Sequence, residues 1–331
     1  MLNLQYYTTD KYFYRDKDIR DAWVSDGDSD FPLLRFHSLD KMDWLDAWGT
    51  TRRGGVSEGC FSSLNLGFST GDDPNLIREN IKRLERRLAI EPCRLVRSHQ
   101  MHGTRLLKLI GPGLEENRET DNSGKPRTNN LENRETNALG DSAENHPGSP
   151  DLTVFQDLVQ VYTGYDGLYT DQPGLALAIS SADCVPILLA DPGSRQIAAV
   201  HSGWKGTVGR IGAKMVGAME VQGAKPEDIV AVIGPSISGS HYEVTEELIR
   251  EFSRVFSPEE METIAVQTDE FHYLLDLWAA CWFSLRQAGL KEENIHFSGL
   301  CTYENWQELF SHRRRGGRRG VMNCLIRIRE S

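Results

Sequence analysis

The chain has 331 residues and a formal net charge of -11. This length allows a core large enough to fold without disulfide bonds. The acidic balance argues against a general nucleic-acid-binding protein, because such proteins neutralise phosphates with Lys and Arg. No apolar run approaches the roughly 18 residues of a membrane-spanning helix. The charge therefore argues against nucleic acid as a partner, and the absence of such a run argues against a membrane.

Cysteine usage indicates a reducing compartment. The cysteines are scattered with no CxxC pair, and the first residues show no apolar signal-peptide region. They are Cys60, Cys93, Cys184, Cys281, Cys301 and Cys324. We therefore expect free thiols and a soluble, cytoplasmic protein.

The first part of the chain divides into a polar lead and a more regular region. Residues 1–30 are acidic and show no lasting period, so we expect a loosely ordered lead. Apolar residues recur at helical spacing over 75–90, which predicts a helix. Asp72 or Asp73, placed before Pro74, is the expected helix cap.

Residues 111–150 differ sharply in composition from their neighbours. They are rich in Asn, Glu, Gly and Pro, and they contain "ENRET" twice. Such a segment cannot bury enough surface to offset its ordering entropy. We predict a disordered insertion that interrupts a single catalytic domain spanning 31–331.

Beyond the insertion, strand and helix patterns alternate. Strand-like runs occur in "LVQVYTGYDGLYTD", "LALAISSADCVPILLAD", "RQIAAVHS", "DIVAVIGPSI", "NIHFSGLCT" and "VMNCLIRIRE". Helices are predicted over 205–223, 243–256 and 275–289. Because hairpins accompany the interleaved helices, we predict an α+β fold with a mixed, partly sandwiched β-sheet and flanking helices.

One predicted hairpin places a cysteine near a histidine. The runs 185–191 and 196–202 flank "PGSR", whose Pro and Gly are typical of turns. Symmetric pairing sets Pro186 against His201, so Cys184 lies diagonally across from His201 on the same face. Diagonal neighbours lie about 7–8 Å apart, which two side chains can bridge through one metal ion.

A third ligand is available in "RSHQMHGT", where His99 and His102 precede a strand-like run. These residues by themselves leave two interpretations open, a metal site or an inert buried cysteine. A buried cysteine is also common as a small inert apolar side chain.

Several blocks taken together resemble the YfiH-like or laccase-domain family, which includes polyphenol oxidases and purine nucleoside phosphorylases. The resemblance runs from about residue 48 to the C-terminus, without the insertion. The blocks are "TTRRGGVSEGCFSSLNLG", "GDDPNLIRENIKRL", "HQMHGT", "DGLYTDQPGLALAISSADCVPILLAD", "AVHSGWKGTVG", "IGPSIS" with "YEV", and "CTYENWQELFSHRR". The resemblance implies a fold similar to the cytotoxic necrotizing factor catalytic domain and a zinc ion held by His102, Cys184 and His201.

The chain departs from the family pattern at four positions near these blocks. The family usually has Val at Met101, Arg at Lys205, Cys at His241 and Tyr at His312. The implied zinc ligands are unaffected, whereas the substrate contacts near these positions are less secure.

The resemblance implies a zinc-dependent enzyme of the transferase and hydrolase classes. Its expected activities are phosphorolysis of adenosine, inosine and methylthioadenosine, and deamination of adenosine, so the expected partners are purine nucleosides and phosphate. Three protein ligands leave zinc a fourth position for water or substrate. Copper is the alternative metal, and the sequence names no protein partner.

Five residues are candidates for proton transfer or substrate binding near such an ion. Asp183, next to Cys184, is a candidate proton carrier, although it can equally orient a loop. Arg52 can hold phosphate or the base through its planar fork, or be a surface arginine. Ser63 and Asn65 can bind ribose or purine, or close a turn. Arg313, from the basic run "HRRRGGRR", is the preferred phosphate contact, and Arg314 shares its block.

Other functional classes remain as alternatives. A copper-dependent polyphenol oxidase is one. As a family expectation, a multicopper enzyme has about ten histidines, many in HxH pairs, whereas this chain has nine histidines and no HxH pair. A cysteine hydrolase, with Cys184 activated by His201, is another. A binding role for the acidic insertion is a third. Serine hydrolase and P-loop functions do not fit, because their motifs are incomplete.

Overall fold

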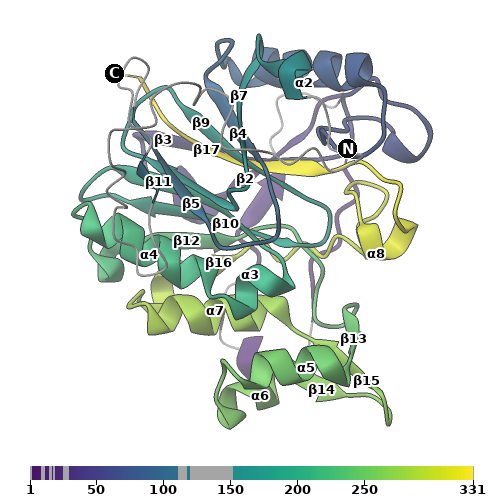
Figure 1. Cartoon of the computed structure of the whole chain (residues 1–331), viewed down its shortest axis with the longest axis vertical. Helices are drawn as coiled ribbons and strands as arrows, with labels where there is room; N and C mark the ends of the chain where they lie inside the picture. Colours follow the sequence, from purple (N-terminus) through teal and green to yellow (C-terminus); the bar gives the residue numbers. More distant parts are fainter. Residues whose placement is uncertain are drawn as a thin grey trace, which may run out of the picture.

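The computed structural model describes residues 2–8, 12–14, 17, 19–24, 30–110, 118–119 and 152–330. Two seven-stranded sheets pack face to face (Figure 1). In order, the first sheet contains β1 (Ala22–Val24), β2 (Leu33–Phe36), β3 (Leu45–Thr50), β17 (Met322–Ile328), β9 (Ala176–Ser181), β4 (Leu95–His99) and β7 (Val159–Thr163). The second contains β16 (Ile295–Phe297), β12 (Val230–Ile233), β10 (Val185–Asp191), β11 (Gln196–Ser202), β8 (Gly167–Thr170), β5 (Leu106–Leu109) and β6 (Arg118–Glu119).

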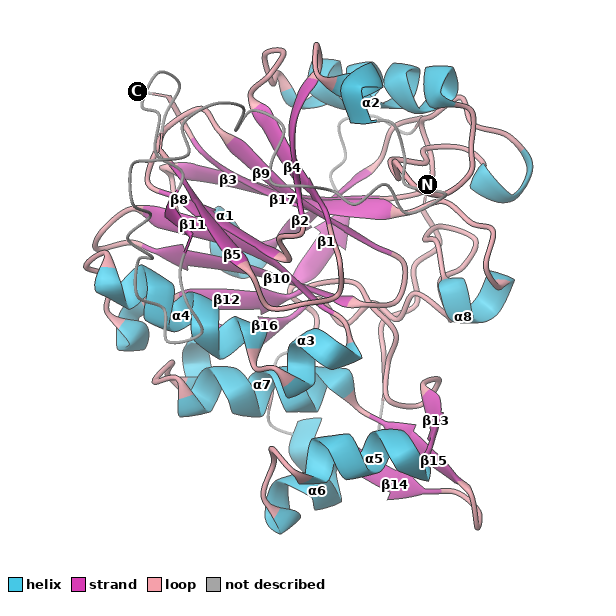
Figure 2. Cartoon of the chain, in the orientation of Figure 1, coloured by secondary structure: helices cyan, strands magenta, loops and turns pink. Residues whose placement is uncertain are grey.

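Helices cover the outer faces of the sheets (Figure 2). The α-helices are α1 (His37–Asp40), α2 (Pro74–Leu88), α3 (Trp204–Val208), α4 (Ile211–Val221), α5 (Glu246–Ser253), α6 (Pro258–Ile264), α7 (Leu277–Gln287) and α8 (His312–Arg315). Short 3-10 helices are η1 (Tyr12–Tyr14), η2 (Gly59–Phe61), η3 (Leu152–Phe155), η4 (Pro226–Asp228) and η5 (Glu292–Asn294). A small third sheet, β13 (Glu243–Thr245), β15 (His272–Leu275) and β14 (Ala265–Gln267), projects with α5 and α6 from the main body. The predicted mixed α+β fold is confirmed, since β4 pairs in parallel with β7 and β9 while β17 is antiparallel to β3 and β9.

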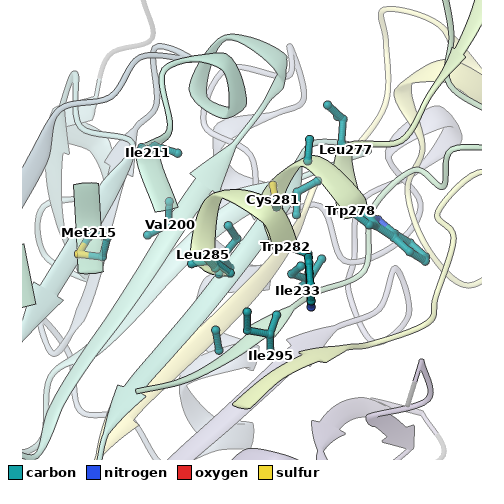
Figure 3. Packing of buried hydrophobic residues seen from close by; sticks show 14 of the residues in the cluster. Val200, Ile211, Met215, Ile233, Leu277, Trp278, Cys281, Trp282, Leu285 and Ile295 are labelled. Carbon is teal, nitrogen blue, oxygen red and sulfur yellow. The ribbon is translucent and has the colours of Figure 1, made fainter. Parts of the chain in front are cut away.

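The core has three layers because strand side chains alternate between faces. Along β10, Leu188 points into the apolar layer between the sheets, whereas Ile187 and Leu189 face the layer under the helices. Figure 3 shows side chains of α7, including Leu285, packed against the sheet in that second layer. The third layer lies under α2, whose Ile81 packs on the outer face of the first sheet.

The predicted hairpin is confirmed in register. β10 and β11 are antiparallel, with Pro186 opposite His201 and Asp191 opposite Gln196. The predicted cap is also present, because the Asp73 side chain accepts a hydrogen bond from the backbone N–H of Asn75 at the start of α2.

Two predicted helices differ from the structure. The single helix over 205–223 is divided into α3 and α4, because Arg210 adopts a left-handed backbone with φ 54° between them. The helix predicted over 243–256 begins later, since Glu243–Thr245 pairs with β15 as strand β13 before α5 starts.

The described parts of the 1–30 lead pack on the domain. Tyr7 and Tyr14 are almost fully buried, and the Tyr14 hydroxyl donates to the Asp276 carboxylate over 2.9 Å. The expectation of a loose lead is therefore wrong for these tyrosines, whose burial depends on partners far along the chain. The domain limits at 31–331 stay a prediction, and the predicted disorder of 111–150 falls outside the described residues apart from β6.

No helix within the described ranges is both long and apolar enough to cross a membrane.

Candidate metal centre

Three potential metal ligands converge where neighbouring strands end. His102 lies on the loop after β4, Cys184 lies between β9 and β10, and His201 lies on β11. One ligand atom from each residue lies within 4.8 Å of the other two. His201 is buried, Cys184 is half-buried and His102 is exposed, so the group opens towards solvent on one side. His99, the other sequence candidate, is not part of this group.

Asp166 holds two of these residues in place. This carboxylate is fully buried, and its Oδ1 lies 2.8 Å from Nδ1 of His201. It also accepts hydrogen bonds from the backbone N–H groups of Met101, His102 and Gly103 at 2.8–3.2 Å. A carboxylate on one ring nitrogen of a histidine leaves the other nitrogen free to bind a metal.

Gly203 leaves the space that the three side chains surround. A Cβ atom at this position would lie 3.1 Å from Sγ of Cys184 and 3.1 Å from Cδ2 of His102. The rings of His102 and His201 are nearly perpendicular, with centroids 4.8 Å apart. A larger residue at this position would require Cys184 or His102 to shift by a few tenths of an ångström.

The charges of the group favour deprotonated sulfur. Burial raises the pKa of the Cys184 thiol, but His201 and His102 outweigh this effect, so the pKa falls below its ordinary value. Burial lowers the pKa of His201, whereas Cys184 and Asp166 raise it. Their combined effect is larger than that of burial, so the pKa of His201 lies above its ordinary value. Thiolate is the form of cysteine that binds metals.

The donor set fits a metal ion. One thiolate and two imidazoles around an open cradle form a set that zinc binds, and copper accepts similar ligands. Both candidate metals are compatible with the residues present, and three ligands leave a position for a further group.

Backbone strain marks two loops of the centre. His102 has φ 57° and Asp183 has φ 99°, a region that non-glycine residues rarely adopt and that costs about 1–3 kcal/mol. The bonds from Asp166 hold the first loop. The second is held by the Asp183 side chain, which accepts hydrogen bonds from the Thr302 hydroxyl and the Arg313 backbone N–H, both at 2.6 Å.

Three predicted substrate contacts make structural hydrogen bonds. The Arg52 guanidinium donates to the carbonyls of Ser62 and Trp306 at 2.7 and 2.8 Å. The Ser63 hydroxyl donates to the Arg52 carbonyl. The Asn65 side chain is fully buried, and its amide donates to two side chains while its oxygen accepts two backbone N–H groups. A substrate role for these residues stays a prediction.

Arg313 lies on the rim of the centre. Its guanidinium packs over the ring of Tyr242, 5.1 Å from the centroid, and donates to the Glu243 carbonyl. Burial raises the pKa of the Tyr242 hydroxyl to about 12. The nearby Cys184 and Asp183 contribute to this increase.

The four departures from the family pattern lie at or near the surface. Met101 is 57% exposed beside His102, and the Lys205 ammonium lies 5.5 Å from the Trp204 ring. His241 stacks on Tyr303 at 4.6 Å. His312 begins α8, the short helix that also carries Arg313.

The sequence analysis missed Asp166. It stands in "YDGLYTD", directly before a buried strand, and the available signal was an acidic residue at the edge of an apolar run. That signal cannot name the partner, because His201 lies 35 residues away.

The fold and the site define a two-sheet α+β protein with a His2Cys group suited to a metal ion. The chain belongs to the family described as multi-copper polyphenol oxidoreductase laccase, which matches residues 46–329.

Relatives and solved structures agree with this assignment. The chain is 32% identical over 298 residues to a purine nucleoside phosphorylase of Bacteroides thetaiotaomicron, covering 89% of this chain and 96% of that protein. It is 34% identical to a purine nucleoside phosphorylase of Deinococcus radiodurans, covering 84% and 87%. The crystal structure of YlmD from Geobacillus stearothermophilus is similar, with a TM-score of 0.74, 29% identity and coverage of 95% and 100%. YfiH of Bacillus licheniformis has a TM-score of 0.73, 29% identity and coverage of 91% and 98%.

Proposed function

We propose that this protein is a zinc-dependent purine nucleoside phosphorylase that acts on adenosine, inosine and methylthioadenosine and also deaminates adenosine. The observation that carries the proposal is the convergence of His102, Cys184 and His201 around the cradle at Gly203. Relatives named purine nucleoside phosphorylase, at 32–34% identity over most of the chain, support it.

Zinc bound by these residues would act as a Lewis acid and lower the pKa of a bound water. Asp166 orients His201 through Nδ1 and holds the loop of His102. The exposed side of the group, at His102, is where a nucleoside can approach.

The remaining candidates act on the substrate in this proposal. Asp183 carries the proton in deamination, and its carboxylate is held at Cys184 by Thr302 and by the Arg313 N–H. Arg313 supplies a guanidinium fork to phosphate. Arg52, Ser63 and Asn65 are assigned to ribose and purine contacts.

A cysteine hydrolase is the second candidate. Asp166, His201 and Cys184 are arranged as orienting carboxylate, base and nucleophile, which is the observation that favours it. His102 beside the same sulfur favours metal binding instead. Copper-dependent phenol oxidation has less support, since the described residues contain one group of this kind.

The test is a chromatographic assay of adenosine, inosine and methylthioadenosine, with and without phosphate, on protein of measured metal content. We expect free base and the corresponding sugar 1-phosphate only with phosphate: ribose 1-phosphate from adenosine and inosine, and methylthioribose 1-phosphate from methylthioadenosine. We also expect slow formation of inosine from adenosine, and loss of zinc and both activities in Cys184→Ala. Cys60→Ala, at a half-buried cysteine outside the group, is the control and should keep both. Zinc-loaded protein that converts no nucleoside contradicts the proposal, and hydrolysis by metal-free protein would favour the thiol enzyme.

A further inference from the structure

Arg319, just beyond α8, has a buried donor atom that is not satisfied. Its Nε is buried and has no hydrogen-bond partner among the described residues, while Nη1 donates to the Gly317 carbonyl over 3.4 Å. Leaving a buried donor unpaired costs about 1–3 kcal/mol, and more for a charged group. Such a group in a native protein calls for an explanation, and an anion that supplies the missing acceptor is one.

The position of Arg319 connects it to the metal centre. Asp183 and Cys184 lie near enough to raise its pKa, although burial lowers it more strongly. The chain is anchored there, because the Asp183 carboxylate accepts the Arg313 backbone N–H at the start of α8 over 2.6 Å. His312 lies among the same charges, and its pKa is lowered by burial and by Arg319. Arg319 and Arg313 therefore both lie at the loop that carries Cys184.

The other arginines of the run have different surroundings. Arg314 and Arg315 pack over the ring of Trp306, and Arg318 lies 5.8 Å from the ring of Phe61. These side chains are exposed. Burial and the unsatisfied Nε therefore distinguish Arg319 from its neighbours.

We propose that Arg319 is an anion-binding residue of the active site, and that it holds a phosphoryl group beside Cys184. A guanidinium presents a planar fork that matches two phosphate oxygens, which would satisfy Nε and reduce the cost of burying the charge. The Asp183 carboxylate accepts hydrogen bonds from Thr302 and Arg313, and no hydrogen bond joins it to Arg319 among the described residues. The assignment of this group to inorganic phosphate as co-substrate depends on the proposed function. The 5′-phosphoryl group of a purine nucleotide offers the same chemistry.

The experiment measures ligand binding apart from turnover. Zinc-loaded full-length protein is titrated with inorganic phosphate and, separately, with adenosine 5′-monophosphate, and binding is followed by calorimetry and phosphorus NMR. We expect Arg319→Met to weaken phosphate binding about tenfold or more, and Arg319→Lys to restore part of it. Arg318→Met, which removes the same charge one residue away, should change the dissociation constant less than about twofold. Zinc content and thermal unfolding are measured for each variant.

The outcomes separate this inference from the proposed function. Loss of phosphate binding in Arg319→Met, with zinc retained, supports the phosphoryl site even if no nucleoside is converted. A rise in the phosphate KM with kcat unchanged supports both. Loss of nucleotide binding alone supports the site and assigns it to the 5′-phosphoryl group. The inference is overturned if the unaltered protein binds neither anion, if Arg319→Met binds both anions as tightly as the unaltered protein, or if Arg318→Met weakens binding as much as Arg319→Met.

Discussion

The single residue Gly203 determines how much space lies between Cys184, His102 and His201. Its φ of -72° is open to any residue type, so alanine would add no backbone strain there. The added Cβ would lie 3.1 Å from both Sγ of Cys184 and Cδ2 of His102. Cys184 and His102 would have to shift by a few tenths of an ångström. We therefore expect Gly203→Ala to bind zinc about tenfold more weakly, because the three ligands would be moved from their common geometry. Competition with a chromophoric chelator measures this change.

Gly217→Ala is the matched control for this substitution. A Cβ on Gly217 meets nothing within 4 Å, and the residue lies within α4. Alanine should therefore keep zinc binding and raise the free energy of unfolding by about 0.5–1 kcal/mol, through helix propensity. Equal zinc affinity in both variants would contradict the role assigned to the cradle.

At the scale of one element, α2 carries a carboxyl group that burial keeps from ionising easily. Glu85 is 5% exposed, its Oε1 has no hydrogen-bond partner among the described residues, and its pKa is raised from 4.5 to about 7. Burial is the main cause and Asp157 adds to it, while Lys82 opposes both. The folded protein therefore binds more protons than the unfolded chain between these two pH values, and stability falls as pH rises through this window.

Glu85→Gln should remove this pH-dependent loss, since the amide stays neutral. We expect the free energy of unfolding of the variant to exceed that of the parent by about 1–2 kcal/mol at pH 8. Near pH 4 the two free energies of unfolding should be equal. Urea denaturation at both pH values measures the difference. Glu79→Gln on the same helix is the control, because the Glu79 carboxylate pairs with Arg83 and Arg86. This variant should be less stable than the parent at pH 8. A parent stability that does not change between pH 5 and 8 would argue against a buried neutral Glu85.

At the scale of the whole molecule, strands on both sides of the insertion form the same sheets. β4 pairs in parallel with β7 and β9, and β5 pairs in parallel with β8. The composition of 111–150 predicts that limited proteolysis cuts there first. Because both fragments contribute to each sheet, we expect the nicked protein to remain associated in gel filtration and to keep its zinc. First cuts within 31–110 or 152–330, or fragments that separate without denaturant, would contradict this prediction.

Local patterns in the sequence determined the elements whose contacts lie close along the chain. The four residues 192–195 join two runs of equal length, and a short turn sets the pairing of the strands that flank it. The opposition of Pro186 and His201, and with it the proximity of Cys184 to His201, therefore follows from the sequence. The capped helix α2 follows in the same way, because its cap and its apolar period lie within one segment.

Only the tertiary structure decided which distant groups meet. The bond between Asp166 and His201, the left-handed Arg210 that divides α3 from α4, and the unsatisfied Nε of Arg319 depend on how the two sheets and the loop after α8 pack. The family resemblance had already pointed to His102 rather than His99, and the structure brings the His102 ring together with Cys184 and His201 beside Gly203. The hydrophobic period specifies which face of an element is buried, but polar side chains find partners through chain packing, which no local pattern records.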